Sequence, residues 1–431
     1  MNKLTVWLIK IAGAFLVIFL ITGRAYSQAG KSLTINQAYD LARKNYPLTE
    51  QLGLIARSAE FTVANAAKGY LPVFSVNGQA TYQSAVTSFP FSIPGFTAPE
   101  YSRDQYRFYT EADQLIYDGG VIKNEKETAE ATRAVQQQSV EVELYALYDR
   151  VNQLFFGALL ADEELKENDL LKMDIRNGIN KAKALVANGV AYRSSVDELS
   201  AQLMQAEQAR VELASVKTAF LNMLGYFLNE PVNDSTVLVK PDEPELSDEV
   251  TRPELLQFDY QQKIYDLQGK LLNVQLRPHI SFFVQGGYAR PGLNMLSNNF
   301  EWYYLGGLRF NWNLGSLYTL KNQRSLLDIN RQTLQLQKET FLFNTTLVMK
   351  QQSADVNKYR RLIMQDDSII DLRESVKKAS YAQLENGVLS AHDYITEVNA
   401  EDQARQSKIT HEVQLLQSKY SYKNTVGDIK K

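Results

Sequence analysis

The most regular hydrophobic pattern of the chain lies between Ser316 and Asn386, a stretch without glycine or proline. Apolar residues recur there at every seventh position, in one long row with a shorter row beside it. The long row consists of Leu320, Leu327, Leu334, Phe341 and Val348 and, after a step of eight residues, of Val356, Ile363 and Ile370. The short row consists of Ile329, Leu336 and Phe343. A sevenfold repeat is typical of a helix packed lengthwise along other helices. The stretch at 316–386 therefore predicts a helix on the order of 105 Å long.

A different pattern, alternation of apolar and polar residues, predicts two β-hairpins, at 70–116 and 278–312. In the second hairpin the aromatic residues Trp302, Tyr304, Phe310 and Trp312 share one face. Each strand has around ten residues or more, which is long enough to span an outer membrane when tilted. One such hairpin alone would equally fit an ordinary soluble protein.

Glycine and proline divide the rest of the chain into helices and turns, and the same order occurs twice. Each half has a helix, a hairpin, a long helix, a turn that we name the tip, and a return helix. The long helices are predicted at 120–188 and 316–386 and the tips at 188–194 and 386–392. Gly157 and Gly178 lie inside the first long helix, and we expect them to weaken it without ending it.

This duplication predicts two structural repeats, 28–228 and 252–431. The linker between them, 229–251, contains three prolines and seven acidic residues. The first helix is expected to start near the cap Thr34 and to break at Asn45-Tyr46-Pro47.

The N-terminus has the pattern of a cleaved secretory signal peptide at 1–27. Lys3 and Lys10 flank an apolar core, and Ala25-Tyr26-Ser27 is a suitable cleavage site. A membrane anchor is the alternative, but the core is short and no second hydrophobic span follows. The chain contains no cysteine, so disulfides and cysteine-linked lipids are excluded. With 46 basic and 49 acidic residues, it lacks the charge excess of a nucleic-acid-binding protein.

Four amphipathic strands are too few to close a membrane barrel, since single-chain barrels begin at about eight strands. Open sheet edges cannot persist against lipid, because their backbone groups would stay unpaired. Several copies must therefore share one barrel if these strands span a membrane. The junctions that would turn strand into helix at the membrane surface are Asp118, Gly119, Gly120 and Gly315.

Short motifs along nearly the whole mature chain carry a family resemblance. In order they are Leu33–Ala38 followed by Asn45–Pro47, Tyr70-Leu71-Pro72, Ile116–Gly120 and Arg252–Leu255. Through them the sequence resembles the outer-membrane efflux family typified by TolC. The resemblance implies a mainly α fold with a small membrane β-barrel, built from long antiparallel coiled-coil helices and two β-hairpins per chain. It further implies a homotrimer whose strands form a twelve-stranded β-barrel and whose helices form an α-barrel tunnel.

The implied function is an outer-membrane exit duct of a tripartite efflux or type I secretion system, which conducts substrates passively from the periplasm to the exterior. Its implied partners are a periplasmic adaptor, an inner-membrane pump and outer-membrane lipid. The alternative is a soluble periplasmic coiled-coil scaffold or adaptor. That alternative predicts hairpins with charged faces and no aromatic band.

The resemblance also assigns roles to the tips and to the start of each return helix. Adaptor docking is implied for Asn188, Gly189, Val190, Asn386, Gly387 and Val388. Gate carboxylates are implied at Asp393, with Glu397 and Asp197 as further candidates, because a ring of carboxylates concentrates negative potential in a narrow pore. Asp393 could equally cap its helix. The family's tyrosine and arginine lock falls on Leu384 and Leu389, so we expect a different lock or a looser entrance.

Other polar residues form no catalytic pattern. The three histidines, His279, His392 and His411, show no metal-ligand spacing. Asp366, Asp367 and Asp371 are interpreted as the solvated face of a long helix. The paired glycines at 286–287 and 306–307 are interpreted as sites of close strand packing or curvature. We therefore expect neither an enzyme nor a cofactor.

Overall fold

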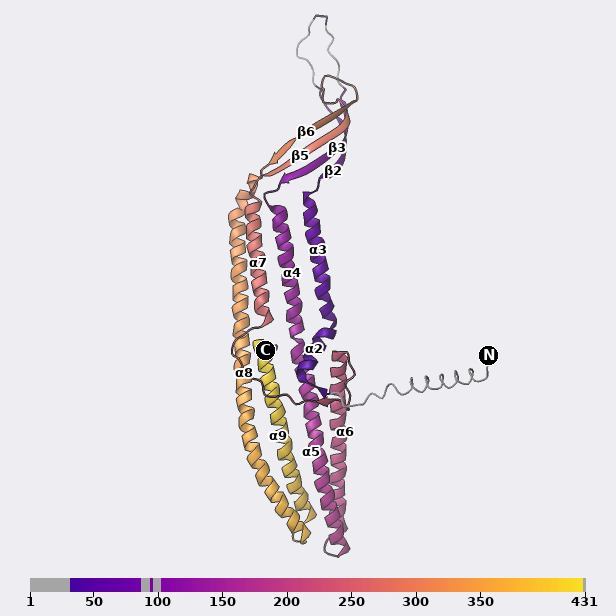
Figure 1. The fold of residues 1–431 in the computed structure, drawn as a ribbon, viewed down its shortest axis with the longest axis vertical. Helices are drawn as coiled ribbons and strands as arrows, with labels where there is room; N and C mark the ends of the chain where they lie inside the picture. The colour runs from indigo at the N-terminus through magenta and orange to yellow at the C-terminus, as the bar shows by residue number, and fades with distance from the viewer. Residues whose placement is uncertain (1–31, 87–93, 96–101, 429–431) are drawn as a thin grey trace, which may run out of the picture. The chain divides into compact units, whose positions relative to one another are not determined.

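The computed structural model describes residues 32–86, 94–95 and 102–428, which divide into two compact units (Figure 1). The sheet unit holds residues 47–146, 247–351 and 423 onward, and the tip unit holds residues up to 46, 147–246 and 352–422. Each predicted repeat contributes to both units. The predicted signal peptide, and the parts of the first hairpin loop at 87–93 and 96–101, lie outside the described residues.

The sheet unit contains one four-stranded antiparallel sheet with the order β2-β3-β5-β6 (Figure 1). Its strands are β2 (Val73–Tyr82), β3 (Asp104–Tyr117), β5 (His279–Arg290) and β6 (Glu301–Asn311). These strands fall in the two segments where alternation predicts hairpins. Strands β2 and β6 are the two outer strands of the sheet.

The strand register places apolar side chains of all four strands on one face. Ala112 lies opposite Phe74 and Val284, and Tyr288 lies opposite Phe108 and Trp302. The other face is polar, and on it Arg309 pairs with Glu111 at 2.9 Å and with Asp113 at 2.7 Å. The sheet therefore has one apolar and one polar surface, as a period of two dictates.

The sheet unit also contains helices that continue from the strands. They are η1 (Pro47–Glu50), α3 (Gln51–Ala67), η2 (Lys68–Tyr70), α4 (Val121–Tyr145), α7 (Pro253–Val274), η3 (Leu314–Ser316) and the first half of α8 (Leu317–Glu385). Helix α4 packs between α3 and α7, and α8 joins α7 through the ion pair of Lys338 with Asp259 at 2.8 Å. On α8 the long apolar row includes the buried Leu334, whereas the short row stays exposed.

One predicted helix, 120–188, is interrupted. Helix α4 ends at Tyr145 and α5 (Leu147–Ala187) begins two residues later. The amide of Ala146 bonds to the carbonyl of Glu143, three residues back, which tightens the turn locally. The second long helix, α8, is continuous over 69 residues. Neither glycine inside α5 ends the helix.

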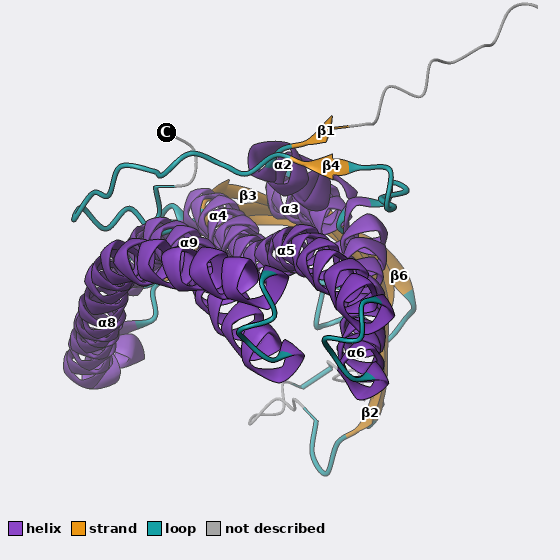
Figure 2. Cartoon of the chain, turned by 90° about the horizontal axis from the view of Figure 1, so that it is seen from below, coloured by secondary structure: helices purple, strands orange, loops and turns teal. Residues whose placement is uncertain are grey.

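The tip unit consists of helices and one short parallel strand pair. Its elements are β1 (Ser32–Leu33), α2 (Ile35–Asn45), α5, α6 (Arg193–Leu228), β4 (Val237–Leu238), the second half of α8, and α9 (Ala391–Val426) as far as residue 422. Strands β1 and β4 lie side by side next to α2 (Figure 2). Thr34 caps α2 through a capping box with Gln37.

The segment predicted as a linker is attached to α9 within the tip unit. Lys240 pairs with Glu412 at 2.8 Å, and the Tyr420 hydroxyl donates to the carbonyl of Asp242. Together with β4, these bonds give the segment a definite place on the helices. Two-residue strands carry no periodicity, so the sequence pattern could not reveal the β1–β4 pair.

Candidate functional site

The first strand–helix junction is a tight turn built by all three of its predicted residues. The Asp118 carboxylate accepts hydrogen bonds from the amides of Gly120 at 2.8 Å and Ile122 at 2.7 Å, which caps the start of α4. Gly119 and Gly120 have φ values of 71° and 99°, in the region that favours glycine. A Cβ on Gly119 would lie 2.8 Å from the Cβ of Arg277.

The second junction uses different chemistry. The side chain of Asn313 accepts a hydrogen bond from the amide of Gly315 at 3.0 Å, in the short helix η3. Gly315 does not have a positive φ. The two junctions therefore occupy corresponding places in the predicted repeats, but only the first needs glycine for its backbone.

Both tips end their long helices with a left-handed glycine. Gly189 has φ 73° and Gly387 has φ 70°. The amide of Val190 bonds to the carbonyl of Leu185 at 2.9 Å, and the amide of Val388 bonds to that of Gln383 at 2.9 Å. These six-to-one bonds are the Schellman motif, which satisfies the last helix carbonyls. The two Asn-Gly-Val turns thus have the same geometry.

A small groove of about 250 Å³ lies between the two tips. Residues of both turns line it, including Val190, Gly387 and Val388. Val190, Val388 and Tyr192 are 61%, 77% and 84% exposed. Exposed apolar side chains beside a groove are typical of a contact surface for another protein.

The three gate candidates occupy separate local arrangements. Asp393 is exposed in the first turn of α9, where its amide bonds to the Ser390 hydroxyl at 3.1 Å and its carboxylate accepts from that hydroxyl at 2.7 Å. Glu397 pairs with Arg373 at 3.3 Å. Asp197 is exposed on α6. Asp393 therefore has a capping role within the chain, and its charge still faces solvent.

The residues at the family's lock positions belong to the apolar interior of the tip unit. Leu384 is buried in the core cluster with Ile175, Leu199 and Tyr394, and Leu389 packs against that cluster. Polar bonds between the tips occur elsewhere. Lys181 on α5 pairs with Glu385 on α8 at 2.5 Å, and Glu198 on α6 pairs with His392 on α9 at 2.7 Å.

We call α5 with α6 the first helical hairpin, and the second half of α8 with α9 the second helical hairpin. The two ion pairs between these hairpins could not be predicted from the sequence. Their residues lie about two hundred positions apart in the chain, and no local spacing indicates such pairs.

The interpretation of Asp366 as part of a solvated face is wrong. Its side chain is buried, and it lies 2.6 Å from the Nδ1 atom of His411. The neighbouring Asp367 pairs with Lys408 on α9 at 2.6 Å. The heptad pattern places Asp366 beside the buried Ile370 on α8, and this position draws it into the packed side. Within the described part of the chain, no three His, Cys, Asp or Glu residues are placed to hold a metal ion.

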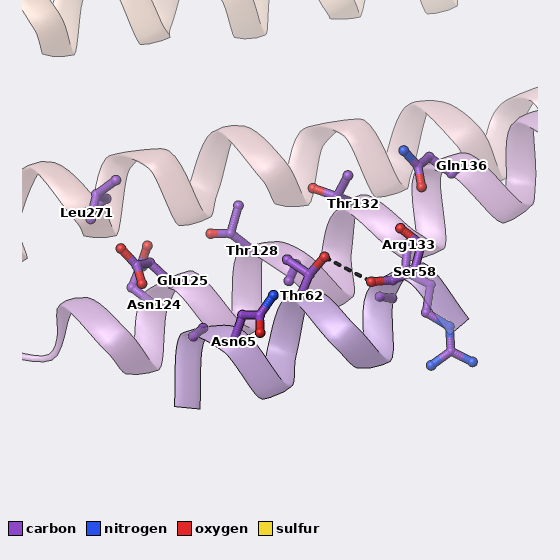
Figure 3. Close-up of a pocket in the computed structure, with 13 residues that line it drawn as sticks. Ser58, Thr62, Asn65, Asn124, Glu125, Thr128, Thr132, Arg133, Gln136 and Leu271 are labelled. Carbon is purple, nitrogen blue, oxygen red and sulfur yellow. Dashed lines mark hydrogen bonds between the residues drawn. The ribbon is translucent and has the colours of Figure 1, made fainter. Parts of the chain in front are cut away.

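A larger groove, of about 650 Å³, lies between α3 and α4 in the sheet unit (Figure 3). Its walls carry hydroxyl and amide groups from Ser58, Thr62, Asn65, Thr128 and Thr132. Figure 3 shows Glu125 and Arg133 at opposite ends of it, and its lining includes no histidine, cysteine or aspartate.

Among residues 32–86, 94–95 and 102–428, no helix is both long and apolar enough to cross a membrane.

Comparison with known proteins identifies the fold. No protein-family model and no curated protein sequence matches the chain. Solved structures do match over nearly the full length. The outer-membrane protein VceC of Vibrio cholerae has 12% identity, a TM-score of 0.63, and coverage of 91% of this chain and 96% of its own. CusC, described as forming a transmembrane channel, has 13% identity, a TM-score of 0.68, and coverage of 93% and 95%.

The MtrE outer-membrane channel of Neisseria gonorrhoeae, solved in an open state, is similar at 14% identity with a TM-score of 0.63, covering 92% of this chain and 89% of its own. The chain therefore has the TolC-like outer-membrane factor fold. The expected fold class, mainly α with a small β portion, is confirmed.

Proposed function

We propose that the chain is one subunit of an outer-membrane exit duct, which conducts substrates passively out of the periplasm for a tripartite efflux or type I secretion system. One observation carries the proposal. A sheet with one apolar surface and with two edges that no described strand pairs continues into helices as long as 69 residues. A soluble protein would have to cover both the apolar surface and the edges.

The apolar surface has the composition of a lipid-facing one. Trp302, Tyr304 and Leu308 on β6 are 83%, 84% and 70% exposed. The charged residues on this face, Asp104 and Arg290, lie at the strand ends and pair with each other. The alternative, a soluble scaffold, predicts charged faces without an aromatic band, whereas this face of the sheet is apolar and aromatic between its ends. Aromatic side chains around an apolar band are typical of membrane barrels.

The open edges favour assembly of several copies. Among the described residues no further strand pairs with the outer edge of β2 or β6, and lipid offers their backbone groups no partners. On either side of the helices of the sheet unit, apolar residues remain exposed, namely Leu54 and Phe61 on α3 and Ile329, Leu336 and Phe343 on α8. Three copies with four strands each would make the twelve-stranded barrel that the resemblance implies. We propose this homotrimer.

The tips are proposed as the docking surface for a periplasmic adaptor, through which an inner-membrane pump would deliver substrate. Support comes from the paired Asn-Gly-Val turns and the exposed valines beside the groove between them. Asp393, Glu397 and Asp197 are proposed as gate carboxylates. Three copies of the exposed Asp393 around an axis would favour cations and could hold a divalent ion.

A matched pair of substitutions on β6 tests the lipid-facing assignment. Leu308 lies on the apolar face and Leu305 on the polar one. Leu308→Arg would place a charge in lipid at a cost of roughly 2–4 kcal/mol near the midplane, whereas Leu305→Arg would face water. We expect membrane-inserted trimer to be lost only for Leu308→Arg, as measured by membrane flotation and native mass spectrometry.

Equal insertion of both variants, or recovery of the wild type as a soluble monomer without detergent, would contradict the proposal. Conductance of the wild-type trimer in planar bilayers would then test the duct itself.

A further inference from the structure

The two helical hairpins of the tip unit meet at a buried cluster of charged side chains. Lys377 on α8 bonds to Asp174 on α5 at 2.8 Å and to Glu401 on α9 at 2.9 Å. Arg405 on α9 bonds to Glu401 and lies 3.4 Å from Glu374. These bonds tie α5 of the first hairpin to α8 and α9 of the second.

The cluster holds more negative than positive groups. Its members are the carboxyls of Glu167, Asp174, Glu374, Glu401 and Asp402 and the cations of Lys377, Arg405 and Lys378, the last of which pairs with Glu374 at 2.5 Å. If all were charged, two negative charges would remain without a cation. Because ion pairs in a poorly hydrated interior stabilise only when each charge is matched, the surplus is costly.

Asp402 is a buried member of the cluster with one carboxylate oxygen left unpaired. It is 8% exposed, and its Oδ2 atom accepts a hydrogen bond from the side-chain Nε2 of Gln406 at 2.7 Å. Its Oδ1 atom is buried and has no hydrogen-bond partner. A buried, ionised carboxylate with one bare oxygen is unfavourable, and a bound proton removes that charge.

We propose that this cluster is a proton-binding site, with Asp402 as its acceptor, which holds the two helical hairpins together when protonated and loosens them when the proton leaves. Only one part of the inference rests on the proposed function, namely that loss of the proton would loosen the entrance of a duct. The proton site itself is a property of the tip unit.

The groups around Asp402 determine its affinity for a proton. Burial, together with the charges of Glu167 from α5 and Glu401 from α9, raises the pKa of Asp402 to about 7, although Lys377 from α8 and Arg405 act in the opposite direction. Burial also raises the pKa of Glu167 on the first hairpin. The folded chain therefore binds a proton at Asp402 under conditions where the unfolded chain does not.

The sign of the pH dependence follows from that difference. A carboxyl whose pKa is raised by folding contributes most to stability at low pH, where it is protonated in both states. Its contribution falls as the pH rises from the ordinary carboxyl value to about 7. Packing of α9 against α5 should therefore weaken toward neutral and alkaline pH.

A second bond between the hairpins depends on pH in the same direction. His392 on α9 pairs with Glu198 on α6, and Glu198 together with Asp393 holds the pKa of His392 above its usual value. The pair is an ion pair only while the imidazole is protonated, and it weakens as the pH rises through that pKa. Acid thus strengthens both connections.

The proton can be observed directly in the full-length protein in detergent. We expect the infrared spectrum to show a protonated-carboxyl band that disappears with a midpoint near the value of about 7 for Asp402. Asp402→Asn should remove this band. Asp367→Asn, which changes an exposed carboxylate paired with Lys408, should leave it unchanged. Absence of the band, or its persistence in Asp402→Asn, would overturn the proposal.

The mechanical effect can be measured between the hairpins. Because the chain has no cysteine, spin labels on Lys183→Cys in α5 and Gln383→Cys in α8, both exposed sites, would be the only labels. Labelled subunits diluted with unlabelled ones would report the distance within one chain. We expect a narrow distance distribution at about pH 5.5 and a broader, longer one at about pH 8.5.

Asp402→Asn, which imitates the protonated side chain, should keep the narrow distribution at both pH values. Glu167→Gln should shift the transition to lower pH, because the charge of Glu167 raises the pKa of Asp402 and its removal lowers that pKa. Identical distributions of the wild type at both pH values would refute the coupling. Neither measurement requires conduction, so failure of this inference can be told from failure of the duct proposal.

Discussion

At the scale of residues, two glycines on α5 make space for aromatic rings from other helices. A Cβ on Gly157 would lie 2.8 Å from the ring of Phe220 on α6, and a Cβ on Gly178 would lie 2.6 Å from the ring of Tyr394 on α9. Tyr394 is among the largest fully buried side chains. The helical cost of these glycines, about 1 kcal/mol each relative to alanine, is offset by the packing of the rings.

Gly178→Ala should therefore destabilise the protein, by roughly 1–3 kcal/mol, because the methyl group would collide with a buried ring. The control is Gly53→Ala on α3, where nothing lies within 4 Å of the new methyl group. That variant should be neutral or stabilised by up to about 1 kcal/mol. Thermal unfolding followed by circular dichroism would compare them, and equal effects would contradict the packing argument.

The exposed Asp393 makes a second prediction at this scale. Asp393→Ala should raise single-channel conductance or weaken block by divalent cations, because it removes negative charge from the proposed entrance. Ser390→Ala is the control, since it removes the helix cap and keeps the carboxylate. If Ser390→Ala changes block as much as Asp393→Ala does, the role of Asp393 is capping alone.

At the scale of elements, the two strand–helix junctions are stabilised by different interactions, although they occupy corresponding positions in the predicted repeats. The first junction depends on a left-handed glycine pressed against Arg277 and on a carboxylate cap. The second depends on the side chain of Asn313, and Gly315 has an ordinary backbone conformation there.

Gly119→Ala should consequently cost roughly 1–3 kcal/mol, from its left-handed backbone and the contact with Arg277. Gly315→Ala should change stability by less than about 1 kcal/mol, because its nearest neighbour is the Asn313 side-chain oxygen at 3.2 Å. Chemical unfolding in detergent would rank the two. A larger effect at Gly315 would show that the second turn needs glycine after all.

At the scale of the whole molecule, the short row on α8 is an apolar surface that the described part of the chain leaves exposed. Ile329, Leu336 and Phe343 are exposed to 56%, 62% and 65%, while Leu334 of the long row is buried. Two apolar rows on one helix fit a helix with neighbours on two sides. One neighbour is α7, and in the proposed trimer the other is a second copy.

Leu336→Glu should thus raise the dissociation constant of the trimer at least tenfold, if burial of that leucine contributes about 1.5 kcal/mol or more at the interface. Gln337→Glu, a neighbouring exposed position, adds the same charge without removing an apolar group. Native mass spectrometry over a dilution series would compare them. Equal trimer fractions would exclude the short row from the interface.

Much of this architecture was accessible from periodicity and from turn residues. Sevenfold spacing predicted α8, alternation predicted the strands, and the Asn-Gly pairs predicted where the long helices end. The tip glycines could be placed from sequence because a left-handed helix end strongly favours glycine. The break at Ala146 and the β1–β4 pair could not, since neither leaves a local signal.

The sequence by itself therefore determined most of the helices and strands and their order, because these depend on local backbone preferences and on the period of apolar residues. The tertiary structure alone decided which charged groups meet. Asp366 joined His411, and Asp402 joined Glu167 and Lys377. Burial and pairing depend on segments far apart in the chain that come together only on folding, so the proposed proton site could be recognised only in three dimensions.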